Sequence, residues 1–235
     1  MSLLSVLLLQ VDKATKAVTD TTATVATAAP EKISLFYLLK EGGILMIPLL
    51  ICSIILVYVF VERYTTIRKA GAIDHNFMNR VREHLLGNNL PGALSMCKSS
   101  VGPVPRMIEK GLSRMNKPID QIEKSMENTG KLEIYQLEKN LSILSTIAGI
   151  APMFGFLGTI AGMIILFFNI QHQGFSLENI AGGIYTKMVT SAVGLIIGLL
   201  AYVAHNYLNA QINKNVNRME AASADFLDML QEQTH

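Results

Sequence analysis

The sequence is poor in several residue types, and each shortage excludes a class of protein. Its 235 residues include no tryptophan, and only 16% are Asp, Glu, Lys or Arg, whereas soluble globular proteins carry about 25%. The two cysteines, Cys52 in an apolar run and Cys97 in a polar segment, give no basis for a disulfide scaffold. The 20 basic residues barely exceed the 18 acidic ones, so nucleic acid is not an expected partner.

Signatures of catalysis and of cofactor binding are also missing. The sequence contains no phosphate-binding loop, no pair of carboxylates in an apolar setting, and no metal-ligand spacing among its five histidines. We therefore predict that the protein is not an enzyme, and that it has no catalytic residue, no metal site and no cofactor.

Three long windows contain no charged side chain: residues 42–61, 140–177 and 188–213. A transmembrane helix needs about 20 mostly apolar residues, and each window provides them. The alternative, a helix buried in a soluble core, rarely stays free of charge for so long. The expected organisation is an N-terminal arm and linker at 1–34, a first transmembrane helix at 35–61, a helical region at 62–140, a second transmembrane helix at 141–170, a loop at 171–187, a third transmembrane helix at 188–207 and a C-terminal helix at 208–235.

The distribution of basic residues predicts the orientation in the membrane. Residues 62–139 hold 13 of the 20 lysines and arginines, whereas the loop at 171–187 holds only Lys187. Because cytoplasmic segments carry the excess of basic residues, 62–140 and the C-terminal tail should be cytoplasmic. The N-terminus and the loop should lie on the opposite side.

The second and third transmembrane helices should continue far into the cytoplasm. No breaker stronger than Gly130 interrupts the pattern between Pro118 and Ile170, so we expect one helix about 80 Å long at 1.5 Å per residue. The third helix should continue past Lys214 toward Leu230. The predicted fold class is therefore an all-α membrane protein.

Small residues recur at helical spacing in the second and third spans. In lipid, small side chains let helix backbones approach closely. These glycines can be packing residues only, and a Ser or Thr hydroxyl can simply bond to its own helix. Those alternatives stay open for the candidates, which are Pro152, Gly155, Gly158, Gly162, Gly194 and Gly198 as packing residues and Thr159, Thr190 and Ser191 as hydroxyl groups.

None of the three spans contains a carboxylate, although proton relays in membranes normally use Asp, Glu or His. His172 and His205 lie near the ends of spans, and Lys187 lies at the mouth of the third. If this protein moves protons, the titrating acid should therefore come from another chain.

Two motifs resemble signatures of a known family. Residues 151–159, Ala-Pro-Met-Phe-Gly-Phe-Leu-Gly-Thr, resemble the Ala-Pro-x-x-Gly-x-x-Gly-Thr signature of the MotA/TolQ/ExbB proton-channel family. Residues 181–184, Ala-Gly-Gly-Ile, and 188–195, Met-Val-Thr-Ser-Ala-Val-Gly-Leu, resemble its third-helix signature. Three spans with a large cytoplasmic region are typical of the ExbB and TolQ branch.

The resemblance implies a motor subunit of the bacterial inner membrane, with its N-terminus in the periplasm and its C-terminus in the cytoplasm. Such subunits form homo-oligomers, usually pentamers, around an ExbD-like or TolR-like dimer that supplies an aspartate. The motor energises a TonB-like transducer for outer-membrane transport. By position, Thr159 and Ser191 match pore-lining hydroxyls, Thr190 adjoins them, and Thr186 stands where many relatives have glutamate. A TolQ-like motor for other envelope or gliding work and a non-conducting scaffold are the alternatives.

Overall fold

The computed structural model describes residues 45–71, 76–174 and 177–234, which all belong to one compact unit, residues 42–235. The predicted N-terminal arm at 1–34 and the first ten residues of the predicted first transmembrane helix lie outside the described residues. Within the described ranges every regular element is an α-helix, so the predicted all-α class is confirmed.

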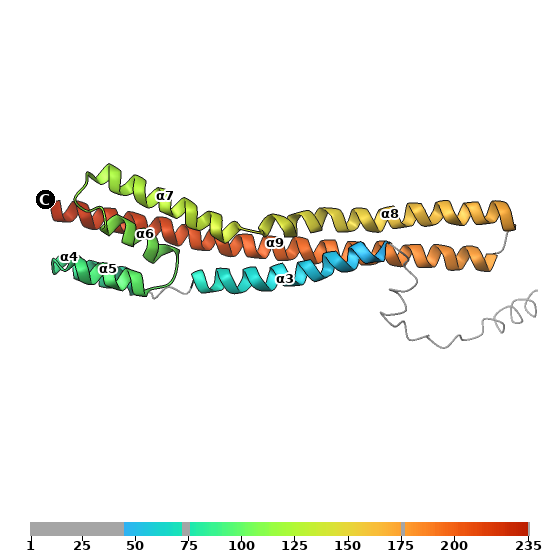
Figure 1. Cartoon of the computed structure of the whole chain (residues 1–235), viewed down its shortest axis with the longest axis horizontal. Coiled ribbons are helices and arrows are strands. Elements are labelled where there is room, and N and C mark those ends of the chain that lie inside the picture. The colour runs from blue at the N-terminus through green and yellow to red at the C-terminus, as the bar shows by residue number, and fades with distance from the viewer. Residues whose placement is uncertain (1–44, 72–75, 175–176, 235) are drawn as a thin grey trace, which may run out of the picture. The chain divides into compact units, whose positions relative to one another are not determined.

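Among the described residues, three helices are long and apolar enough to cross a membrane, as predicted. They are α3 (Met46–Ala70), α8 (Leu141–Gln173) and α9 (Leu177–Thr234), and both α3 and α8 pack along α9 (Figure 1). Leu49, Leu144 and Leu208, one from each helix, are almost completely buried between them. Many other large apolar side chains of these helices stay exposed, which suits a surface that faces lipid.

The C-terminal part of α9 builds a second core with four shorter helices. These are α4 (Phe77–Leu86), α5 (Leu90–Ser99), α6 (Pro103–Leu112) and α7 (Ile119–Glu138) (Figure 1). Phe226 of α9 is fully buried there beside Gly111, whose missing side chain makes room for the Phe226 ring. Burial in this core raises the pKa of the Cys97 thiol to about 11, so the thiol stays protonated at neutral pH.

The single helix predicted from Pro118 to Ile170 is wrong, because the chain leaves the helical conformation between α7 and α8. Lys139 is extended, and Asn140 adopts the left-handed conformation with φ 63°. Asparagine tolerates this region better than most residues because its short polar side chain can bond locally. Sequence patterning missed the break since neither glycine nor proline marks it.

The third long helix also differs from its predicted bounds. α9 begins at Leu177, so it includes most of the predicted loop at 171–187, and Gly174 with φ +85° ends α8. The predicted continuation toward Leu230 is confirmed, since α9 runs without interruption for 58 residues, about 87 Å at 1.5 Å per residue.

We expect Asn140→Val to destabilise the protein by about 1–2 kcal/mol, because a β-branched residue is strained at positive φ. Asn140→Gly should be neutral or stabilising. The control is Asn128→Val, the same substitution on an exposed, helical position of α7. Thermal unfolding of the detergent-solubilised protein measures the effect. Equal midpoints for Asn140→Val and Asn128→Val would show that α7 and α8 can form one continuous helix.

Candidate functional site

The candidate site lies where α8 and α9 approach each other most closely. A Cβ atom on Gly194 would lie only 2.7 Å from the carbonyl oxygen of Ala151 and 2.9 Å from the Cα of Gly155. A Cβ on Gly155 would in turn lie 3.1 Å from the Cα of Ser191. The obstructing atoms are backbone, which cannot move aside without separating the helices. We call this contact between α8 and α9 the glycine seam.

Three further glycines extend the seam along both helices. Gly158 lies against the methyl group of Thr190, and Gly162 lies against the aliphatic part of Lys187. Gly198 lies against the ring of Pro152, where an added Cβ would be 2.5 Å from Cγ. All six packing residues expected from the sequence therefore lie at the seam.

Pro152 has a second effect within α8. Proline has no backbone N–H, so the carbonyl of Ala148 loses its usual helical donor. A Cβ atom on Gly198 would lie 3.2 Å from that carbonyl oxygen. At this point α9 therefore has a glycine, which has no side chain to crowd the carbonyl. The turn of α8 that contains Pro152 therefore lies against Gly198 of α9.

The candidate hydroxyls take different positions. Thr190 is only 1% exposed, because it is enclosed in the seam beside Gly158. Ser191 is half-buried and adjoins Gly155. The half-buried Thr159 donates to the backbone carbonyl of Phe156 at 2.7 Å. Its hydroxyl thus bonds to its own helix, which was one of the two possibilities that the sequence left open. Thr186 belongs to α9, but its side chain lies outside what the structure describes.

Ser191 also opens onto a groove of about 740 Å³ on the surface of α8 and α9. Apolar side chains form nearly all of its lining, which includes Pro152, Phe156, Ile160 and Leu195. Thr159 is not part of this lining, so the groove brings only one of the candidate hydroxyls to its surface. Such a groove is the right kind of surface for an apolar helix that must satisfy one polar group.

The seam offers hydroxyl groups but no carboxylate, and its basic residue, Lys187, contacts Gly162 through its aliphatic part. Residues 140–177 and 188–213 contain no Asp, Glu, Lys or Arg. A Ser or Thr hydroxyl both donates and accepts, so it can bond to a carboxylic acid in either protonation state. These residues can therefore assist a proton-carrying side chain, but they cannot carry the charge themselves.

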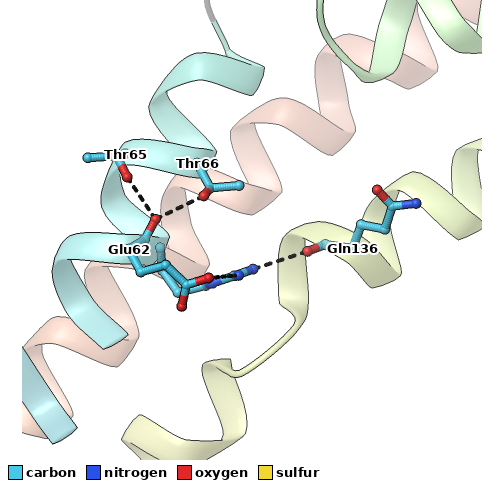
Figure 2. A network of polar contacts seen from close by, with 5 residues as sticks. Glu62, Thr65, Thr66 and Gln136 are labelled. Atoms are coloured by element: carbon cyan, nitrogen blue, oxygen red, sulfur yellow. Dashed lines mark hydrogen bonds and ion pairs between the residues drawn. The ribbon is translucent and has the colours of Figure 1, made fainter. Parts of the chain in front are cut away.

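One buried ionic group was not predicted from the sequence. Arg63, 5% exposed, donates to the backbone carbonyl of Gln136 at 3.2 Å and to the Glu62 carboxylate at 2.5 Å. Thr65 and Thr66 donate to the backbone carbonyl of Glu62, both at 2.9 Å (Figure 2). This network joins α3 to the C-terminal turn of α7, where helix carbonyls favour a cation. The sequence signal for this network was the pair of adjacent opposite charges, Glu62 and Arg63, directly after the charge-free window 42–61.

A comparison with known families identifies the chain. The sequence model of the MotA/TolQ/ExbB proton channel family matches residues 100–221, which include the whole glycine seam. This protein belongs to the MotA/TolQ/ExbB family. The resemblance drawn from the two motifs is thereby confirmed, and with three helices of sufficient length the chain is a multi-pass membrane protein.

Individual relatives of the family place the chain in the ExbB and TolQ branch. A putative biopolymer transport protein ExbB homolog of Methanothermobacter thermautotrophicus is 22% identical over 77% of this chain and 65% of its own length. The putative biopolymer transport protein ExbB-like 3 of Synechocystis is 24% identical over 83% of this chain and 97% of its own length. The Tol-Pal system protein TolQ of Haemophilus influenzae is 30% identical over 41% of each chain. The chain thus spans just under two thirds of the Methanothermobacter relative.

We expect Gly194→Val to separate α8 from α9 and to destabilise the protein by about 3 kcal/mol, the upper end for overpacking, because the valine would meet backbone atoms. The matched control is Gly149→Val in α8, where an added Cβ meets no atom within 4 Å. Thermal unfolding in detergent and the yield of folded protein measure the difference. Equal stability of the two variants would contradict the close contact.

Proposed function

We propose that this chain is an ExbB-like subunit of a motor of the bacterial inner membrane driven by the proton-motive force. It surrounds an ExbD-like dimer and energises TonB-dependent transport at the outer membrane. The observation that carries the proposal is the glycine seam, which presents hydroxyls and no carboxylate within a segment that the proton-channel family model matches.

The partner supplies the acid in this scheme. A helix of an ExbD-like or TolR-like protein lies against the groove beside Ser191 with an aspartate at the same depth. Charging this aspartate in hydrocarbon is costly, so it stays protonated there and releases its proton where water enters. The hydroxyl of Ser191 bonds to the acid in the groove, and the half-buried hydroxyl of Thr159 bonds to it as it passes α8, whereas Thr190 stays enclosed in the seam. Each such bond lowers the cost of moving the group.

A homo-oligomer, with five copies as in the family pattern, completes the pore. Supporting this, the α8 face that includes Phe156, Ile160 and Ile164 is exposed in the single chain. Some of this apolar area faces lipid and the rest covers neighbouring copies and the partner dimer. Residues 62–140 and 208–235 lie in the cytoplasm, and the arm at 1–34 and the turn after α8 lie in the periplasm.

A second motor of the same family remains a candidate. TolQ proteins also match this chain over a shorter stretch, including the TolQ of Haemophilus influenzae at 30% identity over 41% of the chain. In that case a TolR-like partner serves envelope or gliding work instead of TonB-dependent transport. Isolation of the intact complex and identification of its partner chain separates the two motors. If the complex contained no acidic membrane partner, both motors would be excluded and the non-conducting scaffold would be the remaining function.

The test of the proposed function is Thr159→Val in the complex reconstituted with its acidic partner. We expect normal assembly and loss of proton flux, because valine keeps the shape of threonine and removes the hydroxyl. The matched control is Thr146→Val, since Thr146 also donates within α8, to Ser142 at 2.8 Å, on an exposed face. Thr159→Ser should restore flux. Normal flux in an assembled Thr159→Val complex would refute the role.

A further inference from the structure

Two adjoining hollows lie between α3 and α9, where both helices leave their apolar stretches. The first is an apolar groove of about 560 Å³ whose lining includes Leu56, Phe60, Leu200 and Val203. The second is a polar pocket of about 470 Å³. Tyr64 and Tyr207 line both hollows, and their rings stack 6.3 Å apart, so the two hollows meet at this pair of rings.

The polar pocket is strongly cationic. Its lining includes Arg68, Lys214 and Arg218 and contains neither aspartate nor glutamate. The Arg68 guanidinium lies 5.9 Å from the centre of the Tyr64 ring, and Arg218 donates to the carbonyl of Gly71 at 2.9 Å. Within the described ranges, no ion pair joins these three cations to a carboxylate. The pocket therefore holds positive charge that an anion can neutralise.

The pocket lies at the depth of lipid headgroups. The charge-free window of α3 ends at Val61, and that of α9 ends at Asn213. Tyrosines are enriched at this boundary between hydrocarbon and water, which is where Tyr64 and Tyr207 lie. The apolar groove extends from them toward the middle of the spans, at the depth of acyl chains. This placement does not depend on which side of the membrane the helical region occupies.

We propose that these two hollows form one binding site for an anionic phospholipid. Its phosphate binds Arg68, Lys214 and Arg218, and one acyl chain fills the groove between α3 and α9. Basic pockets beside transmembrane helices suit anionic headgroups because the charges meet where water is scarce. A second copy that presented the same face, as in a two-fold dimer, would bring three like charges against these. A neighbour in a ring presents a different face, and it is the alternative occupant that the Val203→Trp variant tests. The site depends on the membrane spans and not on proton conduction, so the two proposals fail separately.

Retention of lipid by the purified full-length protein tests the headgroup half of the site. The protein is exchanged into nanodiscs of equal parts phosphatidylglycerol and phosphatidylethanolamine, extracted gently, and analysed by native mass spectrometry. We expect phosphatidylglycerol to be retained, and its occupancy to fall at least tenfold in R68Q/K214Q. The control R114Q/K117Q removes the same charge from exposed residues of the helical region and should keep the lipid. Equal retention by both double variants would overturn the proposal.

The acyl half of the site has its own test. Val203→Trp fills the groove and should also lower phosphatidylglycerol occupancy at least tenfold, whereas Leu199→Trp should not, because Leu199 is equally exposed but does not line the groove. Inorganic phosphate at millimolar concentration should not displace the lipid. Displacement by phosphate would reduce the site to a simple anion pocket and overturn the proposal. So would an absence of lipid in the wild type together with dissociation of the oligomer on Val203→Trp, which would make the groove an interface between copies.

Discussion

The closest contact between α8 and α9 is backbone against backbone, and the functional part of the molecule depends on it. Because Gly155 and Gly194 have no side chains, the two helices meet at a distance that no other residue pair would allow. In lipid the hydrophobic effect does not drive helices together, so this close packing supplies much of the attraction. The same contact fixes the rotation of each helix. It thereby encloses Thr190 in the seam and directs Ser191 to the groove.

The seam is joined through α9 to the second core, which α9 forms with α4 to α7. This helix contributes Gly194 and Gly198 to the seam and Phe226 to the core with α4 to α7, without a non-helical residue between them. α8, in contrast, is separated from α7 by the non-helical residues Lys139 and Asn140. The seam is therefore connected to the helical region by one continuous helix, α9, and by one interrupted path through α8 and α7. The buried Arg63 ties the end of α7 back to α3 near that interruption.

The sequence predicted the features that depend on long stretches of composition. Three charge-free windows give the three apolar helices, and glycines at helical spacing give the seam residues. Features that depend on one residue's surroundings were not predictable. Asn140 looks like any polar helix residue in the sequence, yet it adopts positive φ and interrupts the helix. The start of α9 was placed too late because a charged residue, Lys187, was read as the edge of the span, although the helix includes it. The pocket of Arg68, Lys214 and Arg218 combines two distant segments, and no spacing along the chain reveals it.

We propose that this chain provides hydroxyls and close-packed helices for proton transfer, while the titrating acid belongs to another chain. Proton flux into vesicles that contain this protein alone, under an imposed membrane potential, tests it most directly. The account predicts flux no higher than in empty vesicles, and strong flux once the acidic partner is added. Flux from the isolated protein at the rate of the complete complex would contradict the account.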